Sequence, residues 1–273
     1  MTPDRWYKAY FFDIDGTLAL GDEIIPGALE CLKVLREEKK IVRFLSNEST
    51  TDNLGHVRRL RKLGIECDGE EILTTIEATS AWIADNFPEA KVFPIGAPDL
   101  KKNLLANEIA VTDDPAQMDI VIASCDHHFS YPELAKAFTA FYQYKQPILI
   151  ATNPDRHGPT GPGTALPDTG FVIAAIEQSA GVKCQEVTGK PNPRMMLAEL
   201  AKLGVAPEDA LMIGDTFETD IQVAHNAGTA SAVTLTGDTS MAQVVAAGPQ
   251  IRPTWVVSNL TEVIPEKYRP SIS

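Results

Sequence analysis

The stretch Lys8-Ala9-Tyr10-Phe11-Phe12-Asp13-Ile14-Asp15-Gly16-Thr17-Leu18 is an apolar run that ends in two aspartates and a glycine. Residues i and i+2 of an extended chain point to the same side, so we expect Asp13 and Asp15 to converge just beyond the end of a strand. Two such carboxylates repel each other unless a divalent cation lies between them or one of them carries a proton. The stretch therefore predicts a buried strand that ends at a reactive centre, with a pair of solvated turn residues as the alternative.

Strand-like and helix-like segments alternate after this stretch. Apolar residues at helical spacing follow from about Pro26, a mostly apolar run covers residues 41–45, and a basic helical segment covers 57–63. The same alternation resumes after Cys184 and includes a buried strand at 211–213. This pattern predicts an α/β fold whose core is a doubly wound parallel sheet with helices on its faces.

The middle of the chain has the composition of a second α/β unit of roughly 100 residues, which is a typical domain size. Strand-like runs occur at 91–96, 119–123 and 147–151, and a loop rich in Pro and Gly covers 153–168. The simplest arrangement is one core domain interrupted by an inserted α/β cap. We predict a core formed by residues 1–77 and 185–273, and a cap formed by residues 78–184.

Composition limits the classes of partner. The formal charge of −13 argues against nucleic acid, because binding to a phosphate backbone needs clustered Lys and Arg. An anionic substrate must therefore be captured by local cations or by a metal. The four cysteines are scattered without a C-x-x-C pair, and no apolar run approaches the length of a membrane span. We expect a cytoplasmic protein that does not bind membranes.

Acidic residues follow two of the predicted strands. Asp13 and Asp15 follow the first, and Asp215 follows the strand at 211–213. The carboxyl ends of the strands form the ligand crevice of an open parallel sheet, so these residues are expected to meet there. Their oxygens suit Mg²⁺, which prefers few carboxylates and several waters or phosphate oxygens. Asp220 is expected on the first turn of the next helix, where it could hold a metal-bound water or Lys190.

Three further polar residues occupy equivalent positions. Ser46 and Asn47 end a predicted strand and can donate hydrogen bonds to a phosphoryl oxygen. Lys190 precedes a predicted helix and can offset developing negative charge. Taken singly, Ser46 could be a helix cap and Lys190 a surface charge. The occurrence of all these residues at strand ends favours a phosphate-binding site.

At these positions the chain resembles the haloacid dehalogenase (HAD) superfamily of phosphatases over nearly its full length. An inserted α/β unit followed by Gly-Lys-Pro resembles the NagD-like, 4-nitrophenylphosphatase branch, which is type IIA with a C2 cap. The matching segments are Asp13-Ile14-Asp15-Gly16-Thr17, Leu45-Ser46-Asn47, Lys190, Gly214-Asp215-Thr216-Phe217-Glu218-Thr219-Asp220 and, in the cap, Ala151-Thr152-Asn153-Pro154-Asp155.

The resemblance implies a role for each motif residue. Asp13 would attack phosphorus and form an aspartyl-phosphate, and Asp15 would act as general acid and then general base. Lys190 and Ser46 would stabilise charge on the equatorial oxygens of the phosphoryl group. Mg²⁺ would be held by the Asp13 carboxylate, the Asp15 backbone carbonyl and the Asp215 carboxylate.

The chain departs from the branch pattern after Asn47, where Glu48 stands in place of a second Asn. A carboxylate there would oppose an anionic substrate unless it is turned away or paired, which leaves substrate preference open. In the cap, Asn153 and Asp155 are expected near the substrate. The Gly/Pro-rich run at 156–163 reads as a shaped loop that could offer Arg156 to the substrate.

Two other groups of residues have simpler interpretations. His127 and His128 could bind a metal, but without a third ligand at a useful spacing they read as solvated loop histidines. The basic cluster Arg58-Arg59-Arg61-Lys62 reads as the solvated face of a helix in an acidic protein.

The sequence thus predicts a Mg²⁺-dependent phosphohydrolase of a small phosphomonoester. Candidate substrates are sugar phosphates, nucleoside monophosphates, phosphoglycolate and aryl phosphates. The alternatives are a phosphotransferase or mutase on the same scaffold, or a non-catalytic metal-dependent binding or regulatory protein. The resemblance also suggests a homodimer formed through the cap.

Overall fold

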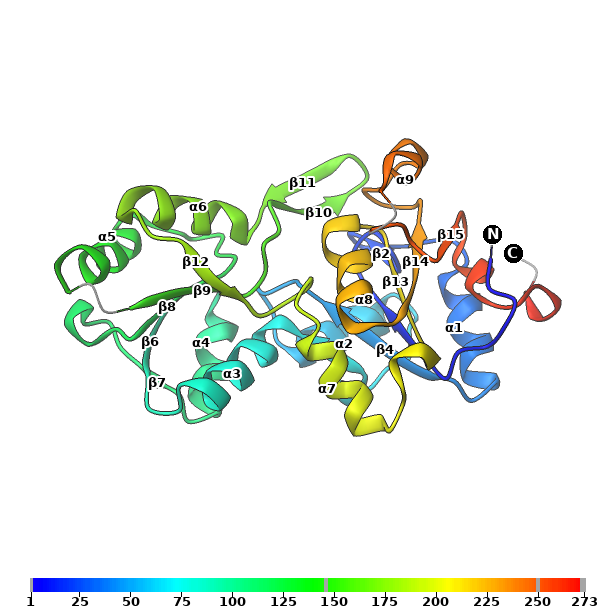
Figure 1. Cartoon of the computed structure of the whole chain (residues 1–273), viewed down its shortest axis with the longest axis horizontal. Coiled ribbons are helices and arrows are strands. Elements are labelled where there is room, and N and C mark those ends of the chain that lie inside the picture. Colours follow the sequence, from blue (N-terminus) through cyan, green and yellow to red (C-terminus); the bar gives the residue numbers. More distant parts are fainter. Residues whose placement is uncertain (1, 145–146, 249–250, 271–273) are drawn as a thin grey trace.

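The computed structural model describes residues 2–144, 147–248 and 251–270. Two parallel sheets lie toward opposite ends of an elongated molecule, and both termini lie at the end that holds the larger sheet (Figure 1). The larger sheet has six strands in the order β15-β14-β13-β1-β4-β5, all of them parallel. Its strands are β1 (Ala9–Phe12), β4 (Ile41–Ser46), β5 (Ile72–Thr74), β13 (Ala210–Gly214), β14 (Ala230–Thr234) and β15 (Trp255–Val257).

Helices cover both faces of the larger sheet because its central strand is apolar on both sides. Phe12 packs with α1 and α2, whereas its neighbour Phe11 packs on the opposite face with α7 and α8. All four residues of β1 are fully buried, as expected for a central parallel strand. The helices on this sheet are α1 (Ala28–Glu37), α2 (Asn53–Lys62), α7 (Arg194–Leu203) and α8 (Gln222–Ala227); α9 (Met241–Ala246) lies farther along the chain.

The smaller sheet has five parallel strands in the order β12-β9-β8-β6-β7. It too is covered on both faces, by α5 and α6 on one side and by α3 and α4 on the other. The strands are β6 (Lys91–Ile95), β7 (Ala110–Val111), β8 (Ile120–Ala123), β9 (Ile148–Ala151) and β12 (Cys184–Val187), and the helices are α3 (Thr75–Asn86), α4 (Pro98–Ala106), α5 (Tyr131–Thr139) and α6 (Thr169–Ala180). The doubly wound α/β fold is confirmed, although β12 runs across the boundary predicted at residue 185.

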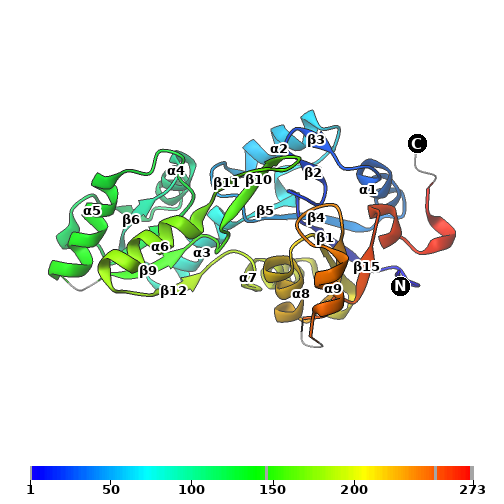
Figure 2. The same ribbon diagram turned by 90° about the horizontal axis from the view of Figure 1, so that it is seen from above.

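The Pro/Gly-rich segment is not the loop that the sequence predicted. It contains an antiparallel hairpin of β10 (His157–Gly161) and β11 (Thr164–Pro167), with a register shift between Pro159 and Gly161. The hairpin extends from the smaller sheet toward the larger one (Figures 1 and 2). It approaches a short hairpin of β2 (Ala19–Leu20) and β3 (Glu23–Ile24), where the Thr160 carbonyl oxygen lies only 2.5 Å from the position that a Cβ would take on Gly21.

Within the described ranges, no helix is both long and apolar enough to cross a bilayer.

Candidate active site

A crevice of about 1080 Å³ lies at the carboxyl ends of the strands of the larger sheet. Asp13 directly follows β1, Asp215 directly follows β13, and Ser46 is the last residue of β4. Because these three strands are neighbours in the sheet, residues about 200 positions apart in sequence meet at one edge. The β10–β11 hairpin contributes to the opposite wall.

Lys190 lies at the centre of the charged groups. Its Nζ is 2.5 Å from Oδ1 of Asp13 and 2.7 Å from Oδ1 of Asp220, and the residue is 2% exposed. Burial alone would lower the pKa of Lys190, but Asp13 and Asp220 raise it overall, so the ammonium keeps its charge. The structure therefore supplies a buried, permanently charged cation beside Asp13.

Asn47 fixes the position of this lysine. Its Oδ1 accepts a hydrogen bond from the Lys190 backbone N–H at 2.8 Å, and its Nδ2 donates to the Lys190 carbonyl oxygen at 3.0 Å. Ser46 is 2% exposed, and its Oγ accepts from the Glu48 backbone N–H at 3.1 Å. Both residues line the crevice beside Lys190, where the sequence placed them.

The negative charge of the buried carboxylates is not balanced by the neighbouring cation. One oxygen from each of Asp13, Asp215 and Asp220 lies within 4.8 Å of the others, and all three residues are buried. Burial, together with the two neighbouring carboxylates, raises the pKa of Asp13 well above its usual range. Burial and Asp220 raise the pKa of Asp215 to about 7. One lysine does not balance three carboxylates, so the donor set fits a divalent cation.

Asp220 is less free than the other two carboxylates to bind a metal. It lies in the π-type turn Phe217–Ile221, and its Oδ2 accepts from the backbone N–H groups of Asp215 and Thr216, each at 3.1 Å. Its Oδ1 accepts from Lys190. Of the two roles that the sequence left open for Asp220, the geometry favours holding Lys190.

Gly16 makes the close approach of the first loop to Asp215 possible. Its φ of +86° lies in the left-handed region, and a Cβ at this position would be 2.4 Å from Oδ2 of Asp215. A larger residue would therefore push the Asp13–Asp15 loop away from the third aspartate.

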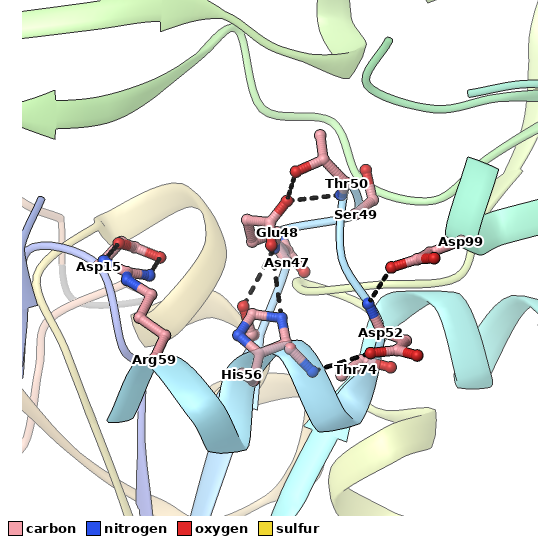
Figure 3. A network of polar contacts seen from close by, with 12 residues as sticks. Asp15, Asn47, Glu48, Ser49, Thr50, Asp52, His56, Arg59, Thr74 and Asp99 are labelled. Atoms are coloured by element: carbon pink, nitrogen blue, oxygen red, sulfur yellow. Dashed lines mark hydrogen bonds and ion pairs between the residues drawn. The ribbon is translucent and has the colours of Figure 1, made fainter. Parts of the chain in front are cut away.

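The side chain of Asp15 points away from this cluster toward α2. Its carboxylate is paired with both guanidinium nitrogens of Arg59, with Oδ1 at 2.6 Å and Oδ2 at 3.1 Å (Figure 3). Arg59 also donates to the Gly21 carbonyl oxygen at 3.0 Å. The interpretation of Arg59 as part of a solvated helix face is therefore wrong, because this residue lines the crevice.

The residues predicted in the cap separate into two groups. Asp155 and Arg156 line the crevice, and Oδ2 of Asp155 accepts from Asn47 Nδ2 at 2.9 Å. Burial raises the pKa of Asp155 to about 6. Asn153 is fully buried and donates to the Asn47 carbonyl oxygen at 2.8 Å, so it supports the Asn47 loop and does not line the crevice. His127 and His128 are both exposed, and His127 also lines the crevice.

Sequence reasoning missed two functional candidates on α2, Arg59 and His56. Both face acidic residues that line the crevice. Arg59 pairs with Asp15, and Nε2 of the buried His56 is 3.5 Å from Oε2 of Glu48. Their spacing of three residues places them on one face of the helix. That spacing was visible in the sequence, but the acidic partners on other segments were not.

Comparison with known proteins agrees with this geometry. Residues 7–228 match the family model of the haloacid dehalogenase-like hydrolases. The chain is 33% identical to the sugar-phosphatase AraL of Bacillus subtilis over 82% of each protein. It is 30% identical to the acid sugar phosphatase of Staphylococcus aureus over 96% of this chain and 98% of that protein.

Solved structures give the same result. The crystal structure of a 4-nitrophenylphosphatase from Thermotoga maritima superposes with a TM-score of 0.85, at 32% identity and 97% coverage of both chains. NagD from E. coli superposes with a TM-score of 0.81, at 26% identity, covering 94% of this chain and 98% of that one. The chain therefore belongs to the haloacid dehalogenase-like hydrolases and, within them, to the NagD-like phosphatases.

Proposed function

We propose that this protein is a Mg²⁺-dependent phosphohydrolase of small phosphomonoesters that acts through an aspartyl-phosphate on Asp13. The observation that carries the proposal is the buried contact of Lys190 with Asp13 and Asp220, set beside Asp215 in a crevice. This arrangement combines a nucleophilic carboxylate, a fixed cation and the donors of a divalent metal site.

In the first step Asp13 attacks phosphorus and the alcohol leaves. Lys190 stabilises the negative charge on the equatorial phosphoryl oxygens, and Ser46 and Asn47 offer hydrogen bonds to the same group. The carboxylates of Asp13 and Asp215 and the Asp15 backbone carbonyl would hold Mg²⁺, which supplies further neutralisation of charge. In the second step water attacks the aspartyl-phosphate and regenerates Asp13.

Asp15 transfers the proton in each step, to the leaving oxygen and then from water. Asp15 lines the crevice, where its carboxylate is paired with Arg59. We expect Asp15→Asn to slow hydrolysis of an alkyl phosphate by roughly 10²-fold or more, the usual scale for loss of general acid–base catalysis. Metal binding should remain, because the side chain is outside the metal donor set.

Initial rates with glycerol phosphate and with 4-nitrophenyl phosphate test this role. The loss should be smaller for 4-nitrophenyl phosphate, whose leaving group needs less protonation. Unchanged hydrolysis of the alkyl phosphate by Asp15→Asn would remove Asp15 from the mechanism.

The crevice and the relatives point to a small substrate. A volume of about 1080 Å³ bounded by the β10–β11 hairpin suits a metabolite better than a protein or nucleic-acid phosphate. Two relatives carry the names sugar-phosphatase and acid sugar phosphatase. Sugar phosphates are therefore the first substrates to test, followed by aryl phosphates, nucleoside monophosphates and phosphoglycolate.

The direct test is phosphate release from such a panel, with Mg²⁺, with EDTA, and after Mg²⁺ is restored to excess. We expect release from at least one sugar phosphate and from 4-nitrophenyl phosphate, loss in EDTA, and recovery with Mg²⁺. Metal binding without phosphate release would favour a non-catalytic protein. Labelled phosphate that appears in an organic acceptor would favour a phosphotransferase.

A further inference from the structure

Glu48 places an acidic residue within the phosphate-binding loop of the crevice. It directly follows Ser46 and Asn47, and all three residues line the same cavity. A free carboxylate at this position would lie a few ångströms from a bound dianionic phosphate ester. At that separation the repulsion between the two negative groups is strong. In the structure the Glu48 carboxylate instead contacts Thr50 and His56.

Thr50 binds one oxygen of this carboxylate. Oε1 of Glu48 accepts from the Thr50 backbone N–H at 2.5 Å and also from the Thr50 hydroxyl (Figure 3). These bonds fold the side chain back over its own loop, toward the beginning of α2. The Glu48 side chain retains only 27% of its exposure.

His56 lies against the other oxygen. It sits in α2, is 1% exposed, and its Nε2 is 3.5 Å from Oε2 of Glu48. Neither of its ring nitrogens has a hydrogen-bond partner within the described part of the chain. Burial lowers the pKa of His56, while the nearby Glu48 and Asp15 oppose that shift and Arg59 adds to it. An imidazole buried without hydrogen bonds costs stability, and its Nε2 lies against the Glu48 carboxylate.

We propose that His56 is a positioning residue. Together with Thr50, it holds the Glu48 carboxylate away from the phosphate position, which allows a dianionic ester to bind in the crevice. The inference rests on the proposed function only in requiring that the ligand is a phosphate. His56 acts through Glu48 and touches neither the substrate nor the reacting atoms.

The test compares His56→Leu with the double variant His56→Leu/Glu48→Gln. Leucine fills the same buried space without an unpaired polar atom, so thermal unfolding should show no loss of stability. We expect His56→Leu to raise KM for 4-nitrophenyl phosphate and the inhibition constant of inorganic phosphate by roughly tenfold at low ionic strength, with kcat unchanged. The increase should shrink in high salt, because it arises from charge repulsion.

Glu48→Gln in the His56→Leu background should restore both constants. Glu218→Gln in the same background is the matched control, since Glu218 also lines the crevice and is exposed. It removes the same formal charge and should restore neither constant.

Two results would overturn the inference: an unchanged KM in His56→Leu, or an increase that persists in the double variant, which would assign His56 a packing role. Calorimetric titration with inorganic phosphate in the presence of Mg²⁺ reads the same difference without turnover. If the wild-type protein hydrolyses no phosphomonoester, the proposed function fails, while this titration still tests the role of Glu48.

Discussion

Replacing Asp13 with asparagine should reduce phosphate release by roughly 10⁴-fold or more, the scale expected when a nucleophile is removed. The amide is close in size to the carboxylate but is a poor nucleophile. It also removes one negative charge from the Asp13–Asp215–Asp220 group, where burial and the two neighbouring carboxylates raise the pKa of Asp13. The variant should therefore fold at least as well as the wild type in the absence of metal.

Initial rates on the best substrate of the panel, measured with a thermal unfolding curve, check this prediction. Asp22→Asn is a suitable control, because Asp22 lines the same crevice and lies outside the buried cluster. Substantial residual turnover by a well-folded Asp13→Asn protein would sink the assignment of the nucleophile.

Replacing Lys190 with methionine should affect both activity and stability. The Nζ ion pairs with Asp13 and Asp220 would be lost, and both carboxylates would remain buried without a counter-charge. Removing one partner from a buried ion pair typically lowers the free energy of unfolding by roughly 3–5 kcal/mol. Loss of a fixed cation at the phosphoryl oxygens should lower kcat by roughly 10²–10³-fold.

Denaturant unfolding with and without Mg²⁺ separates these two effects. Mg²⁺ should recover part of the stability of Lys190→Met, because the metal supplies charge to Asp13 and Asp215, but it should not recover the activity. Lys202→Met is the control, since Lys202 is exposed and its Nζ lies 3.8 Å from Glu199. A Lys190→Met protein with wild-type kcat would contradict the role given to this lysine.

The fold was predictable where one physical cause dominates. An uninterrupted apolar run such as Tyr10–Phe12 can be buried on both faces only in a covered parallel sheet, and the structure places helices on both sides of it. The convergence of Asp13, Ser46 and Asp215 followed from the same topology, because strand ends of a parallel sheet share one edge. Lys190 was predicted from its place before a helix and then from the motif resemblance, and the structure places its Nζ beside Asp13 and Asp220.

The features that the sequence did not reveal depend on contacts that form only in the folded chain. Prolines and glycines at 157–167 read as a loop, yet this segment forms a hairpin with an irregular register. Arg59 lies within a run of basic residues and looked solvated, but the folded chain brings Asp15 within 2.6 Å of it. His56 carried no signal of its own, since its significance comes from Glu48, on the loop before the helix.

Acid quenching of the wild-type enzyme during turnover, followed by peptide mass spectrometry, tests the central claim most directly. The account predicts a single phosphoryl group on the peptide that contains Asp13, present with substrate and Mg²⁺ and absent in the Asp13→Asn variant. Phosphate release at the full rate with no phosphorylated Asp13 at any quench time would contradict it.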